Sequence, residues 1–141
     1  MRKIKFRGKR LHGEKGQWVY GSLVIADPFR MSIYEEDSIC NFRLVAIDCK
    51  SVGQFTGLLD RKGKEIYEGD VLKIYRKEFY VDGSYKFEQL TRDYLVYWSK
   101  DALAFRTKDD EGYCVDFELN YEQYEVVGDI YDDSFKDLWR L

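Results

Sequence analysis

Apolar and polar side chains alternate with a period of two along most of this chain, and this pattern restricts the possible folds more than any other feature. The clearest case is Tyr113–Leu119, in which Tyr, Val, Phe and Leu alternate with Cys, Asp and Glu. Successive side chains of an extended strand point to opposite faces, so alternation is typical of half-buried strands. No long helical pattern accompanies it. The sequence therefore predicts a mostly β fold, or α+β at most.

Composition sets the size and broad class of the protein. Its 141 residues and 16.9 kDa suffice for one domain or two very small ones. The aromatic content of 17%, with one proline and 11 glycines, excludes disordered and collagen-like classes. No run approaches about 18 apolar residues, so no membrane span is expected. The charged start has no apolar segment behind it that would make a signal peptide, and we expect a soluble, cytoplasmic protein.

Two halves are predicted. An N-terminal β subdomain covers residues 1–66, and residues 67–141 are expected to form an SH3-like five-stranded barrel, because closure removes exposed strand edges. A short C-terminal helix at Ser134–Leu138 would plug one end of the barrel, with Phe135, Leu138 and Trp139 on one side. The N-terminal strands are expected at Lys3–Arg7, Trp18–Ile25, Met31–Tyr34, Phe42–Ile47 and Val52–Thr56. The barrel strands are expected at Val71–Tyr75, Tyr94–Trp98, Leu103–Thr107, Tyr113–Leu119 and Tyr124–Ile130.

Residues that carry reactive chemistry are sparse. Cys40, Cys49 and Cys114 are odd in number and lack CxxC spacing, so reduced thiols are expected rather than disulfides or a zinc site. The one histidine, His12, lies beside Gly13 in a polar loop, where a solvated side chain is the simpler interpretation. The glycine spacing fits no phosphate-binding loop. We therefore expect no enzyme activity, no cofactor and no metal.

Charge is distributed unevenly along the chain. The net charge is −3, yet residues 1–10 hold six basic residues and no acid, while residues 109–141 hold eleven acids against two basic residues. On an extended strand Lys3, Lys5, Arg7 and Lys9 would share one face at about 6–7 Å spacing. This basic strip is either solvated or faces the acidic end, or it binds nucleic acid phosphates. Aromatic residues that could then stack on bases are Trp18, Tyr20, Tyr80 and Tyr85.

A second candidate surface surrounds Asp82-Gly83, the strongest hairpin signal in the chain. The residues beside this turn are apolar and prone to form strands. Such a ribbon can add to the sheet of another chain. The sequence therefore suggests an interaction hairpin, for a protein partner or for a homo-oligomer, formed by Phe79, Tyr80, Tyr85 and Phe87.

Residues 52–71 read VGQFTGLLDRKGKEIYEGDV, a segment in which glycines recur and turn the chain repeatedly. Within it, Asp60–Lys64 predicts a hairpin turn with Gly63 at the position that needs positive φ. Ile66 and Tyr67 can hold the connection by burial. We interpret the segment as a structural joint between the two halves.

This segment resembles the YopX family of phage and prophage proteins, and residues 4–7 and 124–131 are similar to that family's start and end. The departures are mild, with Phe55 where tyrosine is commoner and with Leu59 and Arg61 where lysine-like residues are commoner. The resemblance implies a small β-rich phage-encoded protein of a bacterial host, with an SH3-type C-terminal half. It implies no particular reaction.

The sequence thus predicts a protein that acts by binding rather than by catalysis. A protein-interaction or assembly module is the first hypothesis. The alternative is a nucleic-acid-binding accessory or regulatory protein that uses the basic N-terminal strand.

Overall fold

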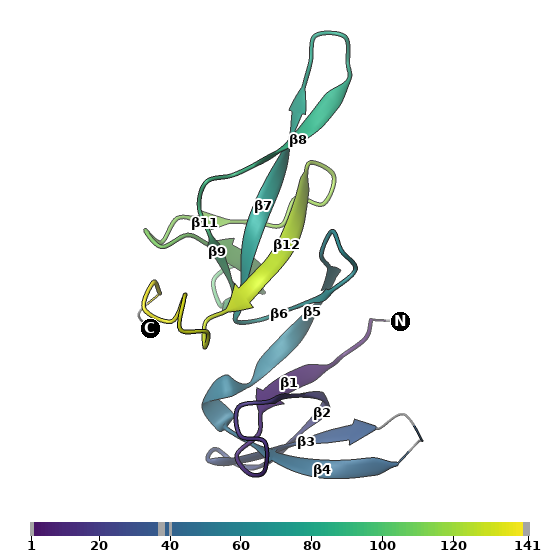
Figure 1. Ribbon diagram of the computed structural model, residues 1–141, viewed down its shortest axis with the longest axis vertical. Coiled ribbons are helices and arrows are strands. Elements are labelled where there is room, and N and C mark those ends of the chain that lie inside the picture. Colours follow the sequence, from purple (N-terminus) through teal and green to yellow (C-terminus); the bar gives the residue numbers. More distant parts are fainter. Residues whose placement is uncertain (1, 37–38, 40, 140–141) are drawn as a thin grey trace. The chain divides into compact units, whose positions relative to one another are not determined.

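The computed structural model describes residues 2–36, 39 and 41–139. Its regular elements are strands, apart from the single 3-10 turn η1 (Cys49–Ser51) (Figure 1). The chain divides into two compact units, Met1–Gly57 and Leu58–Leu141. The mostly β prediction is confirmed. Among the described residues no helix is long and apolar enough to cross a membrane.

The first unit contains an antiparallel sheet in the order β4-β3-β2-β1-β5. Neighbouring strands are paired in sequence from β1 to β4, and β1 also pairs with β5 on its other side. The described residues therefore leave β4 at one edge of this unit. The bounds of the strands are β1 (Phe6–Lys9), β2 (Trp18–Asp27), β3 (Arg30–Glu36), β4 (Phe42–Ile47) and β5 (Gly53–Leu59).

One face of this sheet carries the core of the first unit. The fully buried side chains there alternate with outward-facing residues, as a period-two pattern requires. A β-carbon added to Gly8 would lie 2.4 Å from Cδ1 of Ile47, so glycine lets β1 approach this core closely. The buried cluster consists of Val19, Ile33, Val45 and Ile47, with Phe6, Leu23, Met31 and Val52 packed against it.

The first strand begins later than predicted. The expected strand Lys3–Arg7 is replaced by β1, so Lys3 and Lys5 precede it. Pairing explains the difference, because Phe6 is the first residue with a cross-strand partner on both sides, Gly21 in β2 and Gln54 in β5.

The second unit holds a sheet in the order β11-β10-β9-β7-β12, and β8 pairs with β7 beside that path. Strand β7 is the centre of the unit, since β12, β9 and β8 all pair with it. The bounds are β6 (Glu65–Tyr67), β7 (Asp70–Phe79), β8 (Tyr85–Gln89), β9 (Tyr94–Ser99), β10 (Ala104–Lys108), β11 (Cys114–Val115) and β12 (Glu122–Asp129).

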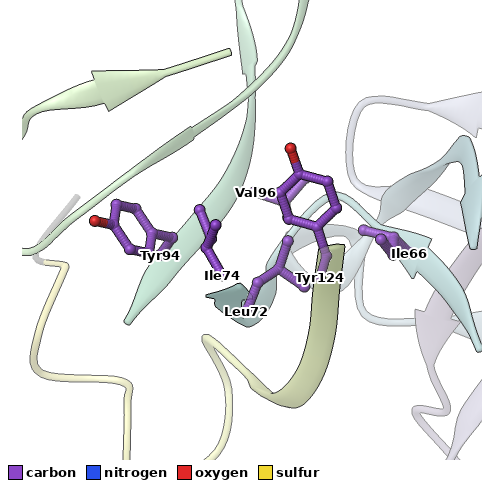
Figure 2. Close-up of a cluster of buried hydrophobic side chains, with 6 residues drawn as sticks. All are labelled: Ile66, Leu72, Ile74, Tyr94, Val96 and Tyr124. Carbon is purple, nitrogen blue, oxygen red and sulfur yellow. The ribbon is translucent and has the colours of Figure 1, made fainter. Parts of the chain in front are cut away.

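The main core of the second unit lies on the side of β7 that presents Leu72 and Ile74, each 0% exposed (Figure 2). Ile66 of β6 belongs to this cluster, which explains why the boundary between units falls before β6. The sequence placed that boundary after residue 66. The complete cluster is Ile66, Leu72, Ile74, Tyr94, Val96 and Tyr124.

The pairings between described residues form an open path, with β11 and β12 at its two ends. They include no closure into a barrel. The predicted strand Tyr113–Leu119 is wrong in length, because β11 contains two residues. The backbone of Glu118 is used locally instead: its N–H donates to the hydroxyl of Tyr124 at 2.7 Å, and its carbonyl accepts from Tyr121 and Glu122. These bonds turn the chain instead of extending a ladder.

The predicted C-terminal helix Ser134–Leu138 is also wrong, since the segment forms successive turns. Trp139 is 6% exposed and packs with Val71 and Leu95, and its indole N–H donates to the carbonyl of Asp109 at 2.9 Å. Leu138 is 44% exposed and does not share this contact. This hydrogen bond fixes the indole to a loop 30 residues away in the sequence. The terminal segment therefore forms turns and not a helix.

Two predicted hairpin turns are confirmed, and they have the same hydrogen bonds. At the first, Asp60 N–H donates to Lys64 O at 2.7 Å and Gly63 N–H donates to Asp60 O, with Gly63 at φ 83°. At the second, Tyr80 N–H donates to Ser84 O and the glycine at position 83 has φ 86°. A residue without a β-carbon adopts this backbone conformation at little cost.

Candidate functional site: two exposed aromatic surfaces

The two units carry opposite net charges. Residues 1–57 hold ten Lys and Arg against six Asp and Glu, a net charge of +4. Residues 58–141 hold thirteen Lys and Arg against twenty Asp and Glu, a net charge of −7. The acidic character of the whole chain therefore belongs to the second unit, and the first unit is cationic.

The first candidate surface is the face of the first sheet opposite its core, here called the basic–aromatic face. Register places Arg7 opposite Tyr20 and Lys9 opposite Trp18. On the other side of β2, Ser22 faces Tyr34. The face consists of Arg7 and Lys9 in β1, Trp18, Tyr20, Ser22 and Val24 in β2, Ser32 and Tyr34 in β3, and Phe42, Leu44 and Ala46 in β4.

Cations lie over aromatic rings along β1 and β2. The guanidinium carbon of Arg7 is 4.1 Å from the ring centre of Trp18, and the ammonium of Lys9 is 5.1 Å from the same ring. The ammonium of Lys5 is 5.8 Å from the ring centre of Tyr20. Stacking of this kind orients both groups and leaves the ring as part of a positively charged surface.

The four predicted basic residues do not form one evenly spaced row. Arg7 is 3% exposed, so its guanidinium belongs to the packed layer beneath the surface. Lys9 is half-buried in β1, and Lys5 is half-buried before that strand begins. Lys3 is exposed in the same leading segment. The structure brings Lys3 and Lys5 to one groove and keeps Arg7 beside Trp18.

A groove of about 600 Å³ lies at the end of the basic–aromatic face that is nearest Lys3 and Lys5. Tyr34 and Phe42 form part of its lining and stack on each other, with ring centres 5.3 Å apart and an angle of 6° between the rings. The groove lining is Lys3, Ile4, Lys5, Tyr20, Gly21, Ser22, Tyr34, Glu35 and Phe42. It combines ammonium groups with flat apolar rings.

The aromatic residues of this groove remain open to solvent. Tyr20 is 39% exposed, Tyr34 is 44% exposed and Phe42 is 55% exposed. Tyr20 was predicted from the sequence as a stacking residue, whereas Tyr34 and Phe42 were not. Alternation within each strand indicated the face of each residue, whereas the cross-strand register that brings them together is not a local signal.

The second candidate surface is the β7–β8 hairpin, which extends beyond the rest of the second unit (Figure 1). Register pairs Phe79 with Tyr85 and Lys77 with Phe87. Tyr85 is 6.0 Å from Phe79 and 5.7 Å from Phe87, measured between ring centres. The ammonium of Lys77 lies 3.9 Å from the Tyr85 ring centre. One face of the hairpin is therefore aromatic, and Lys77, which was not predicted from the sequence, lies over it.

The tip of the hairpin is also apolar and exposed. Tyr80 is 52% exposed and Val81 is fully exposed, while Phe79 and Tyr85 are 58% and 52% exposed. Phe87, closer to the base, is half-buried. Three of the four predicted hairpin residues thus present most of an aromatic ring to solvent. Exposed apolar surface gathered in this way is typical of an interaction site.

Buried ionisable groups in the second unit have structural partners. The Glu122 side chain is 0% exposed and accepts from Arg76 and from the Tyr124 hydroxyl, each at 2.9 Å. Burial raises the pKa of that hydroxyl well above its ordinary value. Asp70 accepts from the backbone N–H of Tyr67 at 2.7 Å. These buried groups therefore have hydrogen-bond partners in the backbone and in each other.

The histidine and two of the three cysteines lie among the described residues. His12 is exposed in its loop. Cys49 and Cys114 are free thiols, while Cys40 lies outside the described residues. Within residues 2–36, 39 and 41–139, no group of three or more His, Cys, Asp or Glu side chains is arranged to hold a metal ion.

A family model described as YopX protein matches residues 5–135, which is nearly the whole chain. No curated protein matches the sequence.

Proposed function

The chain belongs to the YopX family, and we propose that this member acts by binding rather than by catalysis, with single-stranded nucleic acid as its ligand. The basic–aromatic face of the first unit is the binding surface. The stacked pair of Tyr34 and Phe42 beside Lys3 and Lys5 is the observation that carries the proposal.

The rings of the groove match what an unpaired base needs. Bases of a single strand stack on exposed aromatic side chains, at about 1–3 kcal/mol per base, whatever their sequence. Tyr20, Tyr34 and Phe42 offer such rings on three adjacent strands. A double helix conceals its base faces, so this surface favours a single strand.

The two lysines of the groove suit the phosphates of a nucleic acid strand. Lys3 and Lys5 line the same groove as the rings, so phosphates on either side of a stacked base fall within reach of ammonium groups. The net charge of +4 on the first unit favours approach of a polyanion. With few basic groups at the site, we expect weak, salt-sensitive binding.

The hypothesis that the sequence analysis placed first, a protein-interaction or assembly module, remains a second proposal and rests on the exposed β7–β8 hairpin. An SH3-like barrel likewise remains a proposal for the second unit. The strand order supports it, since the last strand β12 lies beside β7 and β9, β10 and β11 follow in sequence on the other side. The family resemblance and the free thiols support a phage protein that works in the cytoplasm of a bacterial host.

The test is fluorescence anisotropy with labelled oligo-dT and oligo-U at about 50 mM salt, compared with a duplex of equal length. We expect binding to the single strands and weaker binding to the duplex. Tyr34→Ala and Phe42→Ala should each weaken binding about fivefold or more, because each removes a stacking surface worth about 1–3 kcal/mol.

Tyr113→Ala is the matched control, because Tyr113 is 69% exposed in the second unit and should leave binding unchanged. The proposal is rejected if no single strand binds at low salt, or if the control variant weakens binding as much as Tyr34→Ala does. Circular dichroism of each variant separates lost binding from lost folding.

A further inference from the structure

We propose that the outer edge of β8 is a homodimerisation site, at which β8 of one chain pairs antiparallel with β8 of a second copy about a two-fold axis at Phe87. The inference concerns the second unit and is independent of nucleic-acid binding.

The backbone of β8 has an unused edge among the described residues. Tyr80 N–H donates to Ser84 O at 2.8 Å, and Leu90 N–H donates to Ile74 O at 2.8 Å. Backbone groups of an antiparallel ladder alternate in direction, so even-numbered residues of this stretch point toward β7. Tyr85, Phe87 and Gln89 therefore direct their N–H and C=O groups away from β7. An edge of this kind is a template for another strand.

The side chains of β8 select the register of that second strand. The short sequence Lys86-Phe87-Glu88 places opposite charges on either side of its central residue. In a two-fold pair centred on Phe87, Lys86 of each chain lies opposite Glu88 of the other. Centring the axis on Lys86 or on Glu88 would instead oppose two like charges. Opposite charges directly across a strand pair stabilise it, and like charges destabilise it.

The charge alternation continues through the whole hairpin. Within one chain, Glu78 lies opposite Lys86 and Arg76 lies opposite Glu88. Lys86 and Glu88 are also an ion pair, with nitrogen and oxygen 2.6 Å apart. Pairing two copies at Phe87 extends these rows so that Lys86 and Glu88 of each chain have an opposite charge on both sides. The face is self-complementary, as an isologous interface requires.

Pairing two copies at Phe87 would also bury part of the aromatic face of the hairpin. Phe79, Tyr85 and Phe87 lie on the face opposite the charged rows. In the pair, the two copies of Phe87 adjoin, and Tyr85 of each chain lies opposite Gln89 of the other. A single strand pair buries less than the roughly 1,200 Å² of a standard interface, so the dimer should be weak and concentration-dependent.

Sedimentation velocity of the full chain over about two decades of concentration tests the proposal. We expect a reversible dimer. Lys86→Glu should weaken association about tenfold, because every dimer contains the altered pair twice. The double variant Lys86→Glu with Glu88→Lys should restore it, since the exchanged charges remain complementary between the two chains. A circular dichroism spectrum equal to that of wild type shows that the hairpin tolerates the like charges that Glu78 and Arg76 then face within one chain. Lys100→Glu, an exposed change of equal charge outside the hairpin, is the matched control and should have no effect.

Cross-linking tests the register. In a background with the native cysteines replaced by serine, Phe87→Cys should oxidise rapidly to a disulfide-linked dimer, because directly paired residues lie about 5.5 Å apart between α-carbons. Tyr85→Cys should cross-link poorly, since its own copy is not its partner. A monomer at every concentration overturns the proposal, as does a dimer that the charge exchange fails to restore or that cross-links better through position 85.

Discussion

The carboxylate of Asp60 accepts a hydrogen bond from the backbone N–H of Val126, 66 residues further along the chain, at a distance of 3.0 Å. Its other oxygen accepts from the N–H groups of Lys62 and Lys64, at 2.8 and 2.9 Å. Asp60 is 7% exposed. One side chain thus closes its own hairpin turn and fastens that turn to β12, beside the bulge between Val126 and Gly128.

Replacing Asp60 with Asn should destabilise the second unit by about 1–3 kcal/mol, because a buried charged acceptor is lost and an amide group then faces a backbone N–H. Urea unfolding followed by circular dichroism measures the change. Asp82→Asn is the matched control, because Asp82 occupies an exposed hairpin turn and accepts from the backbone N–H and the hydroxyl of Ser84. Equal losses in the two variants would show that the bond to Val126 contributes nothing.

The same carboxylate should make stability depend on pH. Burial opposes its ionisation, but the N–H groups of Val126, Lys64 and Lys62 outweigh this and hold the pKa of Asp60 below its ordinary value of 3.8. Its contribution is complete above that value, falls as the pH drops further, and is lost below the folded-state pKa.

The difference in unfolding free energy between wild type and Asp60→Asn should therefore be constant near neutral pH and shrink below about pH 4. Urea titrations at several pH values measure this difference. A gap that stays constant down to pH 2, or that widens there, would contradict the assignment.

Gly128 leaves room for the ring of Phe135. A β-carbon at position 128 would lie 2.5 Å from Cε2 of that ring and 2.9 Å from Cδ2. Gly128→Ala should destabilise the protein by about 1–3 kcal/mol, because the ring and the terminal turns must move. In a double-mutant cycle with Phe135→Ala, the second change should remove most of this effect. Additive losses would mean that the contact does not limit position 128.

Gly21 is required for close approach of β2 and β3. A β-carbon there would lie 2.2 Å from the carbonyl oxygen of Tyr34, and Gly21 has φ 156°. Gly21→Ala should destabilise the first unit by about 1–3 kcal/mol and weaken oligonucleotide binding, because it separates Tyr20 from Tyr34. Gln17→Ala, an uncharged change at an exposed position outside the groove lining, should be nearly neutral in both measurements.

Salt dependence tests the lysines apart from the rings. For a single strand, the logarithm of the binding constant falls against the logarithm of salt concentration by about 0.7 per phosphate contacted. The double variant Lys3→Ala with Lys5→Ala should flatten this slope by about 1.4, whereas Tyr34→Ala should weaken binding with the slope unchanged. If the slope does not change when both lysines are removed, phosphate contacts lie elsewhere.

The alternation of side chains and the positions of glycines predicted several strands and turns correctly. Alternation around Leu72 and Ile74 predicted the half-buried strand whose inward side chains form the core. Gly63 and Gly83 predicted tight turns, and both have positive φ. These predictions succeeded because side-chain alternation and turn conformation depend on a few consecutive residues.

Side-chain periodicity gave wrong predictions where residues distant in the sequence determine the course of the backbone. The alternating stretch Tyr113–Leu119 is mostly not a strand, because the hydroxyl of Tyr124 takes the backbone N–H of Glu118. The C-terminal turns are held by the bond from Trp139 to Asp109, 30 residues away. Periodicity contains no information about such partners.

The candidate sites likewise have some features that the sequence predicts and others that only the tertiary structure shows. The sequence alone determined that Phe79 and Tyr85 flank a hairpin turn and that the N-terminus is basic, because both features are continuous in the chain. Only the tertiary structure decided that Tyr34 and Phe42 stack beside Lys5, and that Arg7 is buried against Trp18. The physical reason is register: each strand's pattern determines which face a residue occupies, whereas pairing between strands determines its neighbours on that face.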